Sequence, residues 1–296
     1  MSDRKPFVVC PGAAKAGTTT LYALMARHPA VAVTRSKESN FFSEPTLFSR
    51  GCDYYWTTCF EDKPGASVCF EADPNYMYGR GCMQRIRECA PEARIVVMLR
   101  NPADRAYSQY VYRMSYSRYH ESFEEMCRLE AERIARSDAD RHEYACIDRS
   151  RYAPQIREIY AHFPREHVFF LVFERFIADQ TGEFNRLLEW LDLERMHVEP
   201  TRENAAAIAR SKGLARLLYH PEYRRLRSAV GALLPFALKQ RLFGAVVAIN
   251  ARPPNPQERV PLDTALRRQM LDQMRPDVHE VEQLTGCDLG LWLQSA

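Results

Sequence analysis

Several features that define whole classes of protein are missing from this chain of 296 residues. Its nine cysteines include no CxxC pair, so zinc-ribbon and thioredoxin-like proteins lose their main sequence support. There is no internal repeat, and a content of 46% hydrophobic and 27% charged residues excludes a disordered tail protein, a collagen and a disulfide mini-scaffold. We therefore expect a globular, cytoplasmic protein whose cysteines are reduced and mostly buried thiols.

A membrane-spanning segment and a strong excess of one charge are also missing. The most apolar stretch, residues 230–249, carries Lys239, Gln240 and Arg241 in its middle, whereas a spanning helix needs about 20 mainly apolar residues. The 41 basic and 38 acidic residues leave a formal net charge of +3. That balance does not suit a general nucleic-acid binder, although it is compatible with an anion bound locally. We expect no transmembrane segment and no nucleic-acid partner.

Short apolar runs alternate with amphipathic patterns along the first two thirds of the chain. Unbroken apolar runs suit parallel strands that are covered on both faces. Such runs predict strands at residues 7–10, 68–70, 95–99 and 168–173. Apolar residues at helical spacing predict helices over about 21–28, 107–114, 156–163, 184–191 and 263–284. The alternation indicates an α/β fold with a central, mainly parallel sheet and helices on both faces.

The C-terminal third has a looser pattern than the rest of the chain. Between residues 201 and 261 arginines are dense and prolines cluster at Pro253, Pro254 and Pro256, which indicates a lid or an irregular insert. The apolar run 233–249 within it is a candidate dimer face or a cover over a lipophilic ligand. We expect one domain over residues 1–296 with an embellished helical C-terminal third.

A phosphate-binding loop is predicted between the first strand and the first helix. Residues 11–20 read Pro-Gly-Ala-Ala-Lys-Ala-Gly-Thr-Thr-Thr, and small residues before a helix N-terminus let backbone N–H groups surround an anion. The loop differs from a standard P-loop because its lysine lies upstream of the glycine that precedes the threonines. A turn without a ligand is the alternative. The residues expected to bind the anion are Lys15, Ala16, Gly17, Thr18, Thr19 and Thr20.

A second anion site is predicted at the end of the strand 95–99. This strand is followed by Arg100 and not by the aspartate that holds Mg²⁺ in P-loop triphosphatases. Ligands of open α/β sheets bind at the carboxyl ends of strands, so Arg100 and Ser108 form a candidate phosphate clamp. Arg105 is a candidate to brace the turn by pairing with a carboxylate. A capped helix start with a surface arginine is the alternative.

These segments resemble the cofactor motifs of sulfotransferases that use 3′-phosphoadenosine-5′-phosphosulfate (PAPS). The family's 5′-phosphosulfate loop is similar to residues 15–21, and its 3′-phosphate motif is similar to residues 100–108. Four further segments resemble the glycosaminoglycan-type branch of this family and its bacterial relatives. They are residues 37–42 (Lys-Glu-Ser-Asn-Phe-Phe), 70–76 (Phe-Glu-Ala-Asp-Pro-Asn-Tyr), 151–153 (Arg-Tyr-Ala) and 173–176 (Phe-Glu-Arg-Phe). Branch members often carry a lysine near the acceptor where this chain has Ala72. That difference favours a soluble bacterial enzyme with a hydroxyl or amine acceptor other than a glycosaminoglycan.

The resemblance implies a P-loop-like three-layer fold and a sulfotransferase that needs no metal. Such an enzyme moves the sulfuryl group from PAPS to a hydroxyl or amine of a small-molecule, glycan or lipid acceptor and releases 3′,5′-ADP. The resemblance gives Lys15 the role of neutralising the bridging oxygen, and Glu38 that of deprotonating the acceptor. A solvated charge, or a partner for Lys37, is the alternative for Glu38.

Residues are also predicted for the acceptor site and for a loop that covers the cofactor, and alternative roles for these residues stay open. The candidates for the acceptor site are Lys37, Glu71, Asp73 and Tyr54. Glu71 is equally expected to pair with Arg100 or Arg105, and aromatic residues as dense as those at 54–56 more often form core. Arg210 and Lys212 belong either to a basic loop over the 3′-phosphate or to a solvated helix.

Two other classes of protein remain as competing hypotheses. A P-loop kinase that uses ATP and Mg²⁺ is disfavoured by the displaced lysine and by the missing aspartate after the strand 95–99. A non-catalytic nucleotide-binding module is disfavoured because Lys15 and Glu38 are both present.

Overall fold

The structure is a computed structural model that describes residues 5–115, 121–199, 208–209, 211, 213–214, 245–246, 249–252 and 261–294. Backbone contacts divide the chain into two compact units. The first comprises Met1–Arg105, Asp148–Glu203 and Arg267–Ala296, and the second comprises Ala106–Ile147 and Asn204–Leu266. Arg210, Lys212 and most of the segments 201–261 and 233–249 lie outside the described residues. The expectation of a single domain stays a prediction.

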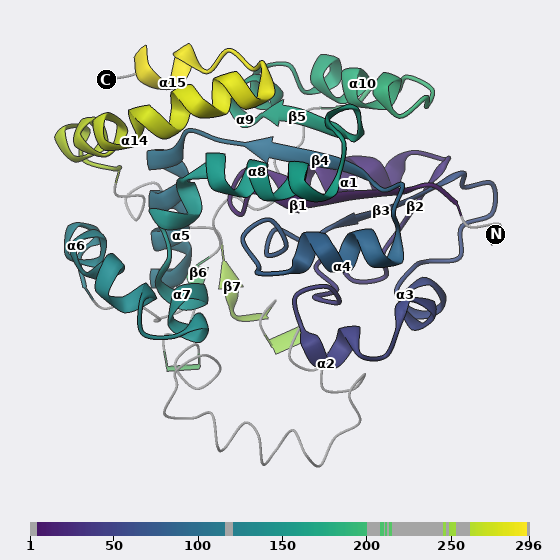
Figure 1. The fold of residues 1–296 in the computed structure, drawn as a ribbon, viewed down its shortest axis with the longest axis horizontal. Helices are drawn as coiled ribbons and strands as arrows, with labels where there is room; N and C mark the ends of the chain where they lie inside the picture. Colours follow the sequence, from purple (N-terminus) through teal and green to yellow (C-terminus); the bar gives the residue numbers. More distant parts are fainter. Residues whose placement is uncertain are drawn as a thin grey trace. The chain divides into compact units, whose positions relative to one another are not determined.

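A five-stranded parallel sheet forms the centre of the first unit (Figure 1). Its strands lie in the order β2-β3-β1-β4-β5, and every neighbouring pair is parallel. The strands are β1 (Phe7–Gly12), β2 (Val31–Val33), β3 (Val68–Ala72), β4 (Arg94–Leu99) and β5 (Val168–Val172). The α/β prediction is confirmed. The strand expected to end at Phe173 stops one residue earlier, because Phe173 begins a helix.

Helices cover both faces of this sheet, as the sequence pattern predicts. Figure 1 shows α4 (Cys82–Cys89) and α8 (Tyr152–His162) on one face and α1 (Thr18–Arg27) on the other. The other helices of the unit are α2 (Pro45–Phe48), α3 (Cys52–Thr58), α9 (Phe173–Ala178), α10 (Gln180–Trp190), most of α14 (Thr264–Thr285), α15 (Gly290–Gln294) and the 3₁₀ turns Asp148–Ser150 and Arg165–His167. No described helix is both long and apolar enough to cross a lipid bilayer.

The core lies where the apolar strands meet the apolar helix faces. All six residues of β1 and the last five of β4 are buried, as expected for strands covered on both sides. The aromatic residues of α3 belong to this core, as their density predicts: Tyr55 is fully buried and its ring stacks on Phe41 at a centroid distance of 4.7 Å.

The second unit is mainly helical in its described part. It contains the rest of α5 (Pro102–Ser115), which begins in the first unit, together with α6 (Phe123–Ile134) and α7 (Asp138–Tyr144). A two-stranded antiparallel ladder joins β6 (Ile208–Ala209) to β7 (Ala251–Arg252). Serine side chains cap α6 and α7, because Ser122 and Ser137 accept hydrogen bonds from backbone N–H groups of the first turns.

A disulfide bond joins Cys52 of α3 to Cys89 of α4, with 5.3 Å between their Cα atoms. The expectation that every cysteine is a thiol is therefore wrong for this pair. Its members are 37 residues apart, and no local motif marks a pairing at that distance. The other seven cysteines form no disulfide bond, and three of them, Cys10, Cys82 and Cys146, are buried. The cytoplasmic location stays a prediction.

Candidate active site

The segments that carry the predicted site residues follow neighbouring strands of the sheet. Because all five strands are parallel, their carboxyl ends lie at one edge, where ligands of open α/β sheets bind. Strand β1 lies between β3 and β4, so the loop after Gly12 has the end of β3 on one side and Arg100 on the other. The segment after β2 joins the same edge, since the N–H of Thr34 donates to the carbonyl of Phe70 at 3.2 Å.

The loop after β1 has the backbone of a tight anion-binding turn. The N–H of Ala13 donates to the carbonyl of Met98 at 2.8 Å and ties the loop to β4. Lys15 and Gly17 both adopt positive φ, at 69° and 92°. A side chain at Gly17 would also lie 2.9 Å from the ring of Phe173. Glycine is therefore required here by the backbone and by the close approach of that ring.

The Lys15 ammonium lies in a buried, positively charged environment. Burial lowers the pKa of Lys15 from 10.5 to about 8; nearby Arg100 lowers it further, while Glu38 raises it. Helix α1 begins with the threonines that follow this loop, and two of them, Thr18 and Thr20, are buried. Backbone N–H groups at such a helix start have no partner within the helix. The loop therefore offers a desolvated cation, hydroxyls and N–H groups to an anion.

Arg100 contacts the phosphate loop directly. Its Nη1 donates to the carbonyl of Lys15 at 2.8 Å, and its guanidinium lies 4.8 Å from the centroid of the Phe173 ring. Burial lowers the pKa of Arg100, while Asp104 and Glu174 oppose that shift. The structure thus brings together the two cations that the sequence places at neighbouring strand ends.

Arg105 braces the same loop from the first turns of α5. Its Nε donates to the hydroxyl of Ser150 at 2.6 Å, and its Nη1 donates to the carbonyl of Ala14 at 3.3 Å. A bracing role is therefore observed, with a hydroxyl and a carbonyl among its acceptors. Ser108 is half-buried on α5, in the part of that helix assigned to the second unit, and its role at the 3′-phosphate stays a prediction.

A polar frame that the sequence analysis missed holds the backbone after β4. The Glu174 carboxylate accepts the N–H of Asn101 and the indole N–H of Trp292, each at 2.9 Å. The side chain of Asn101 in turn accepts the N–H groups of Ala103 and Asp104 at the start of α5. Glu174 is the glutamate of the Phe-Glu-Arg-Phe segment, so that resemblance was the available signal. Nothing local predicts Trp292, which is 118 residues away.

Glu38 lies close to the phosphate loop in an uncommon backbone conformation. Its φ is 65°, and its side chain is 41% exposed and forms an ion pair with Lys37. The pairing considered as the alternative for Glu38 is thus present. Glu38 also raises the pKa values of Lys15 and Asp73, so its carboxylate lies within electrostatic range of both. Its role as the base stays a prediction.

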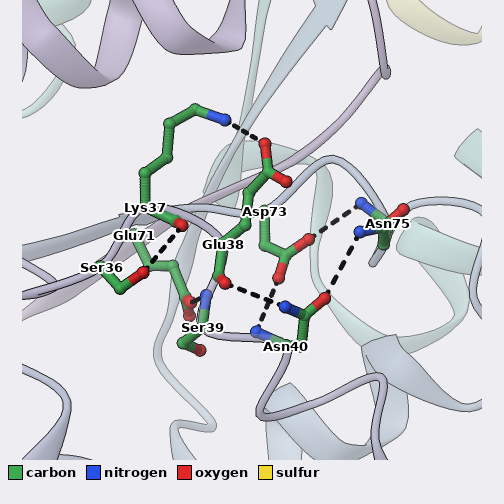
Figure 2. A network of polar contacts seen from close by, with 8 residues as sticks. All are labelled: Ser36, Lys37, Glu38, Ser39, Asn40, Glu71, Asp73 and Asn75. Carbon is green, nitrogen blue, oxygen red and sulfur yellow. Dashed lines mark hydrogen bonds and ion pairs between the residues drawn. The ribbon is translucent and has the colours of Figure 1, made fainter. Parts of the chain in front are cut away.

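Two buried carboxyl groups, Glu71 and Asp73, lie at the end of β3 (Figure 2). Burial and the charge of Asp73 raise the pKa of Glu71 to about 7. Burial and Glu38 raise the pKa of Asp73 to about 6. The expectation that Glu71 pairs with Arg100 or Arg105 is wrong. Its side chain accepts hydrogen bonds from Tyr55, Tyr76 and the Ser39 N–H instead.

Tyr54, the remaining acceptor-site candidate, is half-buried on α3. The guanidinium of Arg50 lies 3.6 Å from the centroid of its ring, and the ring stacks on Phe41 at 6.4 Å. These contacts attach Tyr54 to the aromatic core on one side. A role toward an acceptor stays a prediction for Tyr54, as it does for Lys37.

The central strand of this parallel sheet is followed by a loop that carries a lysine, and the neighbouring strand β4 is followed by an arginine. This arrangement defines a P-loop-like, nucleotide-binding class of protein. Within that class, the family model described as "Sulfotransferase domain" matches residues 5–210, which is more than half of the chain. The chain therefore belongs to the sulfotransferase domain family.

Individual relatives agree with this assignment. The chain is 32% identical over 122 residues to the human bifunctional heparan sulfate N-deacetylase/N-sulfotransferase 3, a match that covers 38% of this chain and 14% of that protein. It is 26% identical over 193 residues to the human heparan sulfate glucosamine 3-O-sulfotransferase 6, which covers 65% of this chain and 54% of that protein. The chain thus spans about half or less of the length of each of these curated relatives.

A solved structure shares this fold. The crystal structure of a sulfotransferase from Alicyclobacillus acidocaldarius superposes with a TM-score of 0.65, covering 98% of this chain and 99% of that one. The two sequences are 24% identical, so the likeness supports the fold and not a substrate.

Proposed function

We propose that this protein is a sulfotransferase that moves the sulfuryl group from PAPS to a hydroxyl or amine of a small-molecule, glycan or lipid acceptor and releases 3′,5′-ADP. The observation that carries the proposal is half-buried Lys15 in the loop after β1, whose ammonium is desolvated, with Arg100 hydrogen-bonded to that loop at 2.8 Å. Two cations at adjacent strand ends suit a nucleotide that carries anionic groups at both its 5′ and its 3′ positions.

Each half of this site binds one end of PAPS in the proposed complex. The loop N–H groups and the hydroxyls of Thr18 and Thr19 bind the 5′-phosphate, and Arg100 with Ser108 binds the 3′-phosphate. The Lys15 ammonium donates a hydrogen bond to the oxygen that bridges sulfur and phosphorus. Negative charge builds on that oxygen in the transition state, so a preorganised cation there lowers the barrier.

Sulfuryl transfer proceeds by in-line displacement in this proposal. The acceptor oxygen or nitrogen attacks sulfur, and the bond from sulfur to the bridging oxygen breaks as the new bond forms. The electron pair leaves on the 5′-phosphate of 3′,5′-ADP, where Lys15 neutralises it. The Glu38 carboxylate takes the acceptor proton, which is a general-base step.

A Mg²⁺-dependent kinase has less support from the same residues. Strand β4 is followed by Arg100, where such an enzyme needs a carboxylate. The carboxylates at the end of β3 accept backbone N–H groups: Glu71 that of Ser39, and Asp73 those of Asn40 and Asn75.

The acceptor belongs to the class of hydroxyl- or amine-bearing molecules in this proposal. The curated relatives act on heparan sulfate, as their names state, which supports including glycans. Ala72 stands in place of the lysine that branch members often carry near the acceptor, which supports keeping small molecules and lipids in the class. A cytoplasmic location and a homodimer stay predictions.

Incubation of the purified protein with ³⁵S-labelled PAPS in EDTA tests this function. The acceptors offered are an N-desulfated glycosaminoglycan, alkyl amines, phenols and long-chain alcohols. We expect transfer of ³⁵S to at least one class, with release of 3′,5′-ADP in equal amount. Arg87→Ala, an exposed position on α4, serves as the control that keeps activity. Phosphoryl transfer from Mg-ATP without any turnover of PAPS would contradict the proposal.

A further inference from the structure

The segment that carries Glu38 holds an unfavourable backbone conformation. Glu38 and Asn40 have φ values of 65° and 57°, within a stretch of three residues. Residues other than glycine adopt this left-handed region rarely, and they keep it only where the surroundings enforce it. The direction of the Glu38 side chain therefore depends on groups that hold this backbone.

Two carboxylates at the end of β3 accept hydrogen bonds from this backbone and keep it in place (Figure 2). Glu71 Oε1 accepts the N–H of Ser39 at 3.2 Å, and Asp73 Oδ2 accepts the N–H of Asn40 at 2.9 Å. The Asn40 side chain closes the turn by donating to the carbonyl of Glu38 at 3.0 Å. Two consecutive N–H groups that follow Glu38 are thus fixed to buried side chains.

The two carboxylates are themselves held in place. Glu71 Oε2 accepts the hydroxyl of Tyr55 at 2.5 Å, and Glu71 Oε1 accepts that of Tyr76 at 3.2 Å. Asp73 Oδ1 accepts the N–H of Asn75 at 3.1 Å. Both carboxyl groups are fully buried, so their rotamers are restricted by packing as well as by hydrogen bonds.

We propose that Glu71 and Asp73 are positioning residues that hold the 38–40 backbone so that the Glu38 carboxylate stays directed at the proton of the acceptor. This inference rests on the proposed role of Glu38 as the base. Glu71 and Asp73 are fully buried and act through Ser39 and Asn40, so neither needs to touch the substrate.

The hydrogen bonds that hold the 38–40 backbone depend on the ionisation of Glu71 and Asp73. An ionised carboxylate accepts hydrogen bonds at both oxygens, whereas a protonated one loses part of that capacity. The groups that face Glu71 are Asp73, Tyr55, Tyr76, Cys59 and Tyr22. Those that face Asp73 are Glu38, Lys37, Glu71, Tyr76 and Cys82. Burial and the charge of Asp73 raise the pKa of Glu71 to about 7, so these hydrogen bonds weaken as pH falls through that value.

Glu71→Gln removes the charge with little change of shape, and hydrolysis of PAPS by water provides an assay that needs no known acceptor. We expect kcat to fall between about 10- and 100-fold, while KM for PAPS stays within about twofold of wild type. The wild-type rate should fall as pH drops through about 7, and the variant should lack that step. Equal kcat values, or the same pH step in both proteins, would overturn the proposal.

The matched control is Glu130→Gln on α6. Glu130 is also a buried glutamate that accepts a backbone N–H, that of Ile147 at 2.8 Å, but it lies in the second unit. We expect this variant to keep the wild-type kcat and pH profile. A loss of kcat equal to that of Glu71→Gln would overturn the positioning role, because any buried glutamate would then have the same effect.

Amide hydrogen exchange tests the hold independently of catalysis. In Glu71→Gln, the amides of residues 39–42 should exchange about tenfold faster than in the wild type, and those of β1 should be unchanged. Unchanged exchange at 39–42 would overturn the proposal even if activity fell. If the wild-type protein neither binds 3′,5′-ADP nor consumes PAPS, the proposed function fails, and exchange alone still tests whether Glu71 holds the loop.

Discussion

Lys15 connects a sequence motif to a measurable electrostatic property. The loop buries its ammonium beside Arg100, and this lowers its pKa to about 8. A bound anion favours the charged form of the lysine, so binding and protonation are coupled.

The affinity for 3′,5′-ADP should therefore fall as pH rises. Lys15 is mostly protonated at pH 7 and mostly neutral at pH 9, so the Kd should increase roughly tenfold over that range. Calorimetry in buffers of different ionisation enthalpy should also detect proton uptake on binding near pH 8. In Lys15→Met both effects should vanish, and an equal wild-type Kd at pH 7 and pH 9 would refute this role for Lys15.

Glu38 is the second residue whose role can be isolated. Replacing it by Gln keeps the shape of the side chain and removes the carboxylate proposed as the base, so turnover should fall by about 10²–10⁴. Binding of 3′,5′-ADP should stay within twofold of wild type, because the nucleotide site proposed above is formed by other residues. Steady-state kinetics and calorimetry check both points, and near-normal turnover would exclude Glu38 as the base.

The buried Glu71 carboxylate should lower the free energy of unfolding at neutral pH. Its folded pKa of about 7 lies above the ordinary value of 4.5, so the folded state holds its proton more tightly than the unfolded state does. The free energy of unfolding therefore falls as pH rises from about 4.5 to 7. Asp73 acts in the same direction, between its ordinary value of 3.8 and about 6.

Glu71→Gln should consequently be more stable than the wild type at pH 8, by about 3 kcal/mol, and similar to it at pH 4. Urea unfolding at the two pH values measures the difference. A variant that is both slower and more stable is the result expected of a group retained for function. A loss of stability at pH 8 would show that Glu71 is retained for folding.

At the scale of elements, the disulfide between α3 and α4 closes a segment of 37 residues. A cross-link of that span stabilises a protein by about 3–4 kcal/mol, mainly by restricting the unfolded chain. Reduction, or Cys52→Ser, should therefore lower the free energy of unfolding by that amount. Titration of the denatured, unreduced protein should find seven thiols, and a count of nine would contradict the bond.

The elements also show which parts of the fold a sequence pattern can predict. Strands β1, β3, β4 and β5 are apolar runs covered on both faces, and all four were expected. Strand β2 was missed because its three residues are too few to make a pattern. Phe173 looked like the end of β5, since an apolar residue that begins a helix extends the apolar run of the strand before it.

The candidate site was predictable where it follows from topology. Lys15 and Arg100 meet because each follows one of two neighbouring parallel strands, and that order can be inferred from the motifs. The contacts of Glu71 with Tyr55 and of Glu174 with Trp292 depend on side-chain packing between distant segments. No spacing rule encodes such contacts, so the sequence left Glu71 between the acceptor site and a pairing with Arg100 or Arg105, and the partners observed for Glu71 were not among those alternatives.

At the scale of the whole molecule, the first unit carries the phosphate loop, Arg100, Glu38 and the carboxylates that hold its segment. The family match covers residues 5–210 and therefore includes all of these parts. The fold and the cofactor half of the site thus agree, and both favour a nucleotide that is anionic at its two ends.

Calorimetric titration of the EDTA-treated protein with 3′,5′-ADP, and in parallel with ATP, is the decisive measurement. We predict micromolar binding of 3′,5′-ADP without Mg²⁺, weakened at least tenfold in Lys15→Ala and in Arg100→Ala and unchanged in Arg87→Ala. Absence of 3′,5′-ADP binding, together with Mg²⁺-dependent binding of ATP, would contradict the assignment of a PAPS site and identify the loop as that of a kinase.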